Sequence, residues 1–217
     1  ERVNRLVPVV VIGDRNTSLN VDTVEMNNYS AGAIIAHYMI GLGHKHIAYI
    51  STTLNEANSA RVRRLEGVRD TYRAEGSVIV RSREVTPKEE RDNISIEHAV
   101  GFELTRKCLG ERHITAFVAV NDMVAYGVLD AIRAEGRRVP EDYSVCGFDN
   151  IFPSQFLPVG LTTVEHYIAD KGRNAFEILH SKMSGESSDR NITRVEFKHH
   201  LIVRDSTAAP RGEEKTG

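Results

Sequence analysis

The sequence has no tryptophan and only two cysteines among its 217 residues. Cys108 and Cys146 lie far apart within apolar segments, and their spacing matches neither a zinc site nor a redox motif. We therefore expect two buried free thiols in a protein of a reducing compartment, the cytoplasm.

Long hydrophobic runs and an excess of one charge are also missing. No apolar run approaches the roughly 20 residues of a membrane-spanning helix, and no signal peptide opens the chain. The formal net charge is −2, with basic residues scattered among acidic ones. Since nucleic-acid-binding modules usually carry a basic stripe, we do not expect this stretch by itself to bind nucleic acid or a membrane.

What is present is a regular alternation of two patterns. Continuous apolar runs predict buried strands at 7–14, 46–51, 77–80, 115–120, 143–149 and 161–164, and residues 192–206 also have strand character. Helical periodicity predicts helices at 27–44, 59–75, 94–110, 122–136 and 167–185, with a charged loop at 83–93. The alternation predicts an α/β fold with parallel sheets covered by helices on both faces.

The usual motifs of cofactor and catalytic sites are absent. No G-x-G-x-x-G follows a strand, and neither a P-loop nor a G-x-S-x-G elbow occurs, so no cofactor, catalytic residue or metal site is predicted. His44 and His46 lack a third metal ligand, and a partly cationic His44 ring at a helix C-terminus is the simpler interpretation. An acid/base pair of Asp122 with Asp149 is the less favoured interpretation, because the position of Asp122 suggests a helix N-cap.

Polar residues follow two of the predicted strands, at Asn121–Asp122 and at Asp149–Asn150. In open parallel sheets ligands bind beyond the carboxyl ends of the strands, and one strand–helix unit separates these two polar tips. Carboxylate and amide groups suit a hydroxylated ligand, and a guanidinium would complete the set. The helix after strand 46–51 offers Arg61, Arg63 and Arg64, and periodicity alone does not choose among them.

The effector-binding core of the lac-repressor (LacI/GalR) family of bacterial transcription regulators resembles this chain over roughly residues 5–207. Five segments carry the resemblance in order: NNYSAGAIIAHYMIGLGHKHIAYI, RRLEGV, FVAVNDMVAYGVLDAIRAEGRRVPEDYSVCGFDN, LTTVEH and LIVRDST. The resemblance implies two Rossmann-like subdomains of the periplasmic-binding-protein type, with the effector bound in the cleft between them.

The same resemblance implies which residues bind the effector. By position, the arginine of the family's R-x-x-G motif is Arg64, and the asparagine of N-D-x-x-A-x-G is Asn121. The aspartate of G-[FY]-D-[DN] is Asp149, and Asp14 and His166 are further carry-overs.

Domain boundaries follow from the resemblance as well. Residues 1–45 and 163–206 are expected to form a partial N-terminal subdomain, residues 46–162 the C-terminal subdomain, and residues 207–217 a disordered tail. The family's helix-turn-helix DNA reader and first βα units have no counterpart here, so we expect the N-terminal subdomain to be incomplete. The loop at 83–93 also lacks the aromatic ring that several members stack on their ligand.

The expected function is that of a ligand-responsive repressor and not of an enzyme. The chain would be the core that senses a small molecule, such as a sugar, and operator DNA would be contacted only through the missing N-terminal domain. The resemblance implies a homodimer, with Phe152 and Phe156 as interface candidates. The alternative is a periplasmic-type solute receptor for a sugar, which a signal peptide upstream would select.

Overall fold

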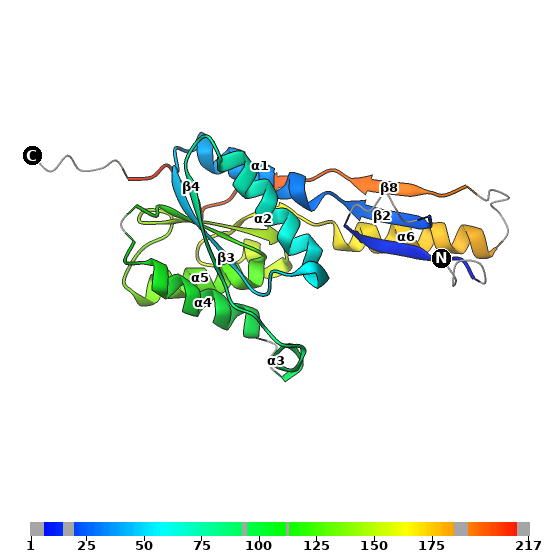
Figure 1. The fold of residues 1–217 in the computed structure, drawn as a ribbon, viewed down its shortest axis with the longest axis horizontal. Helices are drawn as coiled ribbons and strands as arrows, with labels where there is room; N and C mark the ends of the chain where they lie inside the picture. The colour runs from blue at the N-terminus through cyan, green and yellow to red at the C-terminus, as the bar shows by residue number, and fades with distance from the viewer. Residues whose placement is uncertain (1–6, 15–19, 93–94, 112, 185–190, 212–217) are drawn as a thin grey trace, which may run out of the picture. The chain divides into compact units, whose positions relative to one another are not determined.

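The computed structural model describes residues 7–14, 20–92, 95–111, 113–184 and 191–211. It divides into a smaller unit, Glu1–Asn28 with His166–His199, and a larger unit, Tyr29–Glu165 with His200–Gly217. Both units have a sheet made mainly of parallel strands together with helices (Figure 1). The predicted α/β class with parallel sheets is therefore confirmed.

The larger unit is built on a six-stranded sheet in the order β4-β3-β5-β6-β7-β9. Its strands are β3 (His46–Ser51), β4 (Ser77–Ser82), β5 (Ala116–Ala119), β6 (Ser144–Asp149), β7 (Thr162–Glu165) and β9 (Leu201–Ile202). All neighbours pair in parallel except β9, which runs antiparallel to β7. Every parallel strand consequently ends at the same edge of the sheet.

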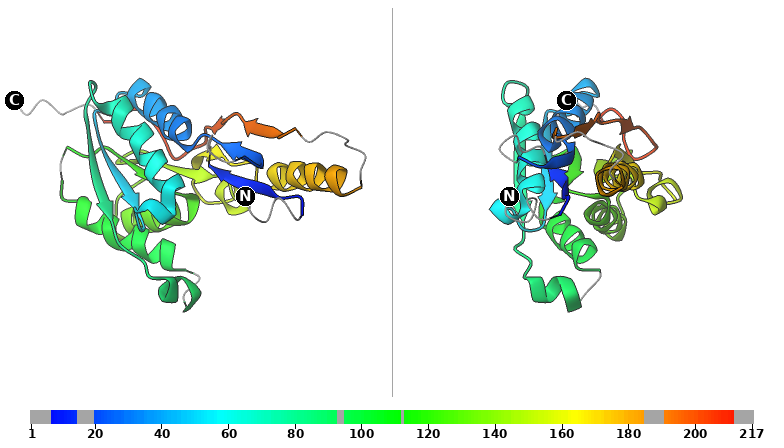
Figure 2. Two further views of the ribbon diagram at one scale, coloured as in Figure 1. Left: turned by 45° about the vertical axis from the view of Figure 1, so that its right-hand side comes forward. Right: turned by 90° about the vertical axis from the view of Figure 1, so that its right-hand side faces the viewer.

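Helices cover both faces of this sheet. Helices α1 (Asn28–Gly41) and α2 (Ser59–Tyr72) lie on one face, and α4 (Ile96–Cys108) and α5 (Asp122–Ala134) lie on the other (Figures 1 and 2). Strands β3, β5 and β6 lie between the two helical layers, and Tyr49, Phe117 and Phe148 are almost completely buried there. Burial of each such side chain stabilises the fold by about 2–3 kcal/mol, which explains the continuous apolar runs in the sequence.

A buried polar group lies at the amino ends of the same strands. The ring of His44 hydrogen-bonds through Nδ1 to Thr115 Oγ1 at 2.8 Å and through Nε2 to Ser144 Oγ at 3.0 Å and the carbonyl of Ala208 at 2.9 Å. Burial lowers the pKa of His44 below its usual range, against the hydrogen bond to Ala208. Burial therefore opposes the partly cationic ring that the helix dipole would favour.

The smaller unit has three parallel strands, in the order β1-β2-β8, and one long helix. The strands are β1 (Val10–Asp14), β2 (Asp22–Met26) and β8 (Arg194–Phe197), and helix α6 (Ile168–Met183) packs on β1 and β2. Strand β2 was not predicted from the sequence, because Asp22 and Glu25 break its apolar pattern. Both acids are nevertheless buried, and Lys182 of α6 donates to both carboxylate oxygens of Asp22 at 2.7 and 2.6 Å.

Two other expected segments differ from the structure. The single strand expected at 192–206 is two strands in different sheets, β8 beside β2 and β9 beside β7, because the chain is irregular at 198–200. The charged loop expected at 83–93 contains a short helix, α3 (Pro87–Asp92).

No helix among the described residues has both the length and the apolar character needed to cross a membrane.

The expected subdomain boundaries also differ from the two units. Helix α1 groups with the larger unit, because α2 approaches it so closely at Gly67 that a Cβ there would lie 2.0 Å from the carbonyl oxygen of Tyr29. Residues 207–211 do not form the expected disordered tail, since the amide of Ala208 donates to Ser144 Oγ at 3.0 Å. Residues 212–217 lie outside the described residues.

Candidate functional site

Three neighbouring strands of the larger unit deliver polar residues to one edge of the sheet. β3 leads into α2, which carries Arg61 and Arg64, while Asn121 follows β5 and Asp149 ends β6. Glu97 joins them from the first turn of α4. These five residues, Arg61, Arg64, Glu97, Asn121 and Asp149, are called the strand-end cluster below.

Arg64 is the centre of the cluster and is only 5% exposed. Its Nη1 donates to the carbonyl oxygen of Val120 at 2.7 Å, and its Nη2 lies 3.4 Å from Asp149 Oδ1. The guanidinium also lies over the ring of Phe148, 4.8 Å from its centroid. A buried cation held by a carboxylate, a carbonyl and an aromatic face has a fixed position and plane, as a hydroxyl-recognition site requires.

The strand that ends in Gly-Phe-Asp-Asn leaves the sheet with an unusual backbone. Asp149 has φ +112° and Asn150 has φ +51°. Asparagine tolerates the left-handed region, whereas a positive φ at aspartate stores strain that the surroundings must maintain. Asn150 Oδ1 accepts a hydrogen bond from Arg204 Nη2 at 2.7 Å, and its Nδ2 donates to Glu165. These contacts hold the turn that presents Asp149 at the sheet edge.

Asn121 has two roles at the start of α5. Its Oδ1 accepts a hydrogen bond from the amide of Val124 at 2.9 Å, so Asn121 is the N-cap, and the expectation that Asp122 caps this helix is wrong. Its Nδ2 donates to Glu97 Oε2 at 2.9 Å. The other carboxylate oxygen of Glu97, Oε1, accepts from Arg61 Nη2 at 3.0 Å, so Glu97 connects Arg61 with Asn121.

Asp122 is fully buried beside the cluster. Its Oδ2 accepts from Ser154 Oγ at 2.5 Å and from the amide of Ile151 at 3.1 Å, and its Oδ1 accepts from Thr163 Oγ1 at 2.7 Å. Desolvation raises the pKa of Asp122 to about 7, although these hydrogen bonds oppose the change. A Cβ at Gly147 would lie 2.4 Å from Oδ1, so only glycine leaves room for this carboxylate.

Several buried polar atoms near the cluster have no hydrogen-bond partner among the described residues. They are the hydroxyl groups of Tyr49, Ser51 and Thr52, Arg61 Nη1 and Arg83 Nε, all on β3 or on the segments that follow β3 and β4. An unpaired buried polar atom costs about 1–3 kcal/mol, so such atoms are rare in stable cores. Several of them at one strand edge indicate a place where a polar ligand binds.

The chemistry of the cluster favours binding. Within the described residues, no group of three or more histidine, cysteine, aspartate or glutamate side chains could hold a metal ion. Both cysteines are buried, and burial raises the pKa of each thiol, which makes them poor nucleophiles. Guanidinium donors, carboxylate acceptors and an amide together match the hydroxyl groups of a small polyol or sugar.

The structure places the predicted site residues in two groups. Arg64 and Asp149 are in contact, and Asn121 directly follows Val120, whose carbonyl Arg64 binds. Asp14 and His166 belong to the smaller unit, whose position relative to the larger one is not described. The side chain of Asp14 lies outside the described residues, and His166 is partly buried and precedes α6 in the chain.

Sequence reasoning missed Glu97 and left Arg61 undecided. No spacing links them, because they are 36 residues apart and meet only when α2 and α4 are folded. The one available signal was an acidic residue in the first turn of a predicted helix that follows the charged loop.

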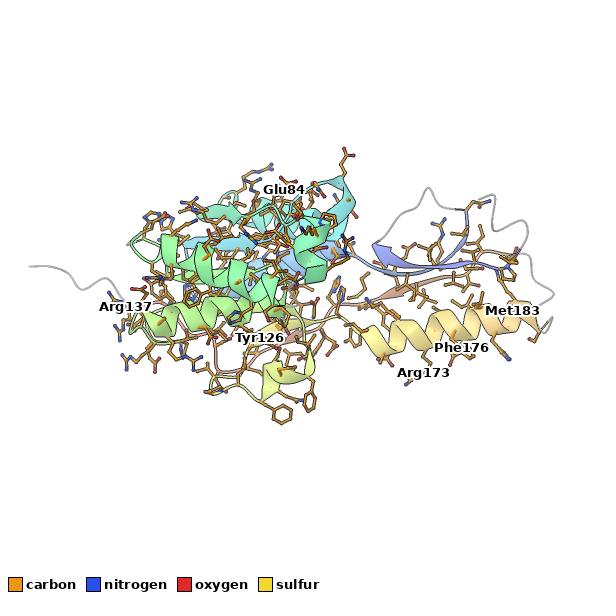
Figure 3. The ribbon with its side chains drawn as sticks, turned by 90° about the horizontal axis from the view of Figure 1, so that it is seen from below. Glu84, Tyr126, Arg137, Arg173, Phe176 and Met183 are labelled. Atoms are coloured by element: carbon orange, nitrogen blue, oxygen red, sulfur yellow. The ribbon has the colours of Figure 1, made fainter. Side chains whose placement is uncertain are left out.

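Two surface hollows lie away from the cluster. One, of about 450 Å³, is lined by residues of α2 and β4 that include the exposed pair Asp70–Arg73. The other, of about 690 Å³, lies at the ends of α4 and α5 and is lined in part by Arg137, a residue labelled in Figure 3. Both are open and walled by solvent-exposed charges, so the strand-end cluster is the better candidate site.

Comparison with known proteins gives consistent results. Residues 36–207 match the family of periplasmic binding protein-like domains. The chain is 30% identical over 201 residues to the HTH-type transcriptional repressor PurR of Histophilus somni, and 31% identical over 204 residues to the arabinose metabolism transcriptional repressor of Geobacillus stearothermophilus. These alignments cover 92% and 94% of this chain.

Solved structures agree with the sequence comparisons. A LacI family transcriptional regulator from Arthrobacter, solved in complex with lactose, superposes with a TM-score of 0.73 at 26% identity, over 92% of this chain and 71% of that one. The chain spans only 57% of the length of the PurR relative and 54% of the arabinose repressor.

Proposed function

The chain belongs to the periplasmic binding protein-like domain family, among the effector-binding cores of LacI/GalR regulators, and we propose that it senses a small hydroxylated molecule for a transcriptional repressor. The observation that carries the proposal is the contact between Arg64 and Asp149 at the strand ends, beside several unpartnered buried polar atoms. Arg64, Asn121 and Asp149 are the proposed effector ligands, with Asp14 and His166 as further ones.

The proposed mechanism is a shift between conformations of the repressor. An effector changes that equilibrium only by its difference in affinity for the two states. Guanidinium and carboxylate groups with fixed positions favour one arrangement of ligand hydroxyls, so the state that holds them in place is stabilised. In the whole protein, DNA binding would belong to a separate domain, and the protein would act in the cytoplasm without catalysing a reaction.

Sugars are the proposed ligand class. The comparison structure holds lactose, and the arabinose repressor is named for a sugar pathway. The cluster offers no aromatic side chain to stack on a ring, and the chain has no tryptophan, so hydrogen bonds must carry recognition. This favours a small, densely hydroxylated molecule.

A thermal-shift screen of sugars, polyols, purines and phosphosugars tests the proposal. A ligand at 100 times its Kd stabilises the folded state by about 2.7 kcal/mol, which raises Tm by roughly 5–10 °C for a chain of this size. Arg64→Ala and Asp149→Asn should each abolish that shift. Arg63→Ala is the matched control on the same helix, because the Arg63 side chain is 52% exposed and contacts Glu66 and the ring of Tyr29, neither of which belongs to the cluster.

The outcome that opposes the proposal is equally clear. If both cluster variants respond to the ligand as the wild type does, the ligand binds elsewhere. If Arg63→Ala also abolishes the shift, the effect reflects the charge of α2 and not the cluster.

We also propose that Phe152 and Phe156 lie in a homodimer interface. Their side chains are 74% and 67% exposed, and their rings contact each other at a tilt, with 4.8 Å between centroids, so they form an exposed aromatic pair of the kind enriched at interfaces. The double change Phe152→Ser with Phe156→Ser should yield monomers in sedimentation-velocity experiments. Phe176→Ser on α6 is the control, since Phe176 is 65% exposed in the smaller unit (Figure 3). An unchanged dimer in the double variant would contradict the assignment.

A further inference from the structure

We propose that Glu97 and Arg61 make the strand-end cluster selective for neutral ligands and exclude anionic ones, such as phosphorylated or acidic sugars. This inference rests on the proposed effector function, because it concerns which ligands that site accepts. Glu97 was not predicted to bind the effector, and Arg61 was only one of three arginines among which the sequence did not choose.

Glu97 holds two members of the cluster at once. Its Oε1 accepts from Arg61 Nη2 at 3.0 Å and its Oε2 accepts from Asn121 Nδ2 at 2.9 Å. The side chains of Arg61 and Glu97 are only 21% and 24% exposed, so water screens the pair incompletely. The carboxylate therefore has a defined place beside a proposed effector ligand.

The formal charges of the cluster cancel. Arg61 and Arg64 supply two positive charges, and Glu97 and Asp149 supply two negative ones, each within 3.4 Å of a guanidinium. A phosphate or carboxylate that approaches either guanidinium would meet a carboxylate already in place, and like charges at such distances repel in a partly desolvated site. A hydroxyl group can accept from a guanidinium and donate to a carboxylate, so the same arrangement fits neutral ligands.

One donor of the pair still needs a partner. Arg61 Nη1 is buried and has no hydrogen-bond partner among the described residues, although Nη2 is engaged by Glu97. The hydroxyl group of Tyr49 is also buried without a partner, and the charges of Arg61 and Arg64 act on it. A ligand hydroxyl that accepts from Nη1 would satisfy this donor without disturbing the ion pair.

An ordinary surface ion pair on the same helix provides the contrast. Arg63 and Glu66 lie 2.7 Å apart, but their side chains are 52% and 45% exposed. Their pairing involves neighbouring turns of α2 alone, and such pairs contribute little. Glu66 is therefore a matched control for Glu97, with the same charge and the same kind of partner.

The test uses inorganic phosphate as the anionic probe. Wild type, Glu97→Gln, Glu66→Gln, Arg61→Gln and the double variant Glu97→Gln with Arg61→Gln are melted in increasing phosphate, with ionic strength held constant by sodium chloride. We expect Glu97→Gln to gain a saturable rise in Tm, with an apparent phosphate affinity at least tenfold above that of wild type. Glu66→Gln should behave as wild type, and the double variant should lose the gain.

Two results would overturn the inference. One is a Glu97→Gln variant that responds to phosphate no more than the wild type does. The other is a wild type that already binds phosphate and loses this response on Arg61→Gln, because Glu97 would then not exclude anions. Glu97→Ser, which removes the same charge at this partly exposed position, serves as the second variant if Glu97→Gln does not fold.

This test is separate from the test of the proposed function. Phosphate binding to Glu97→Gln does not require that the natural effector be known. If no neutral sugar or polyol shifts the wild type but Glu97→Gln gains phosphate, the proposed ligand class fails while the role of Glu97 stands. If a neutral ligand binds through Arg64 and Asp149 but Glu97→Gln gains nothing, only the role of Glu97 fails.

Discussion

The two ends of strands β3, β5 and β6 both carry buried polar groups, but of different kinds. At the amino ends, burial lowers the pKa of His44, and both of its ring nitrogens have hydrogen-bond partners. At the carboxyl ends the groups are charged, and unpartnered atoms collect there. Five of the six unpartnered buried side-chain atoms described in the larger unit lie at this edge, the exception being Thr105 of α4.

This difference separates stability from function within one sheet. A buried polar group that is fully partnered stabilises the fold, and removing it leaves its partners unsatisfied. A buried group without a partner weakens the fold until a ligand supplies one. Variants at the amino end should thus alter stability, and variants at the carboxyl end should alter ligand binding.

The largest expected effect on stability comes from Asp122. This residue sharpens the comparison between the two ends of the strands, because it lies at the carboxyl edge although its carboxylate has hydrogen-bond partners. Folding raises its pKa from 3.8 to about 7, so the folded state favours the protonated acid. The stability from this group is complete below about pH 4 and is lost as pH rises to about 7, on the order of 4 kcal/mol in total. Asp122→Asn should remove this pH dependence, as urea unfolding between pH 4.5 and 8 would reveal.

Glu103 is the control for Asp122, because its effect on stability changes with pH in the opposite direction. The hydrogen bond and charge of Lys107 lower the pKa of Glu103, so its contribution is present at neutral pH and is lost as pH falls. The free energy of unfolding of wild type minus that of Glu103→Gln should increase as pH rises. The free energy of unfolding of wild type minus that of Asp122→Asn should decrease as pH rises. A constant difference between wild type and Asp122→Asn would show that Asp122 is ionised throughout.

His44 gives the next largest effect. His44→Ala removes a buried ring together with its hydrogen bonds to Thr115, Ser144 and the carbonyl of Ala208, which should cost about 3 kcal/mol in the free energy of unfolding. His46→Ala is the control, since His46 is partly exposed and its ring hydrogen-bonds to Ser77 and packs edge-on against His113, and the change should cost less than about 1 kcal/mol. Ligand affinity measured on folded His44→Ala should equal that of wild type; a loss of affinity would mean that the two ends are coupled.

The sequence predicted the strands of this sheet but only some of the residues at their ends. Apolar runs placed β3, β5 and β6, because strands buried on both faces must be apolar throughout. The periodicity of the sequence could not show which of Arg61, Arg63 and Arg64 faces the ligand site, since the answer depends on how α2 is rotated against the sheet. It could not assign the cap of α5, because Asn121 and Asp122 are both good N-caps.

Contacts between distant segments were beyond the reach of pattern analysis. The pairing of Glu97 with Arg61 needs the whole sheet in place, and the buried acids of β2 concealed a strand whose charge is balanced by Lys182. In each case tertiary structure overrides a local signal.

Two buried tyrosines provide the finest test of the comparison, with the smallest effect. Tyr49 and Tyr72 are both at most 1% exposed. The hydroxyl group of Tyr72 donates to the carbonyl of His44 at 3.0 Å, whereas that of Tyr49 has no partner among the described residues. Tyr72→Phe should therefore cost about 1 kcal/mol, and Tyr49→Phe should be neutral or stabilise by up to about 1 kcal/mol. Urea unfolding of both variants at one pH measures the difference, and any bound hydroxylated ligand should weaken on Tyr49→Phe alone. Equal destabilisation by the two changes would mean that an unpartnered atom at the carboxyl edge does not mark a ligand site.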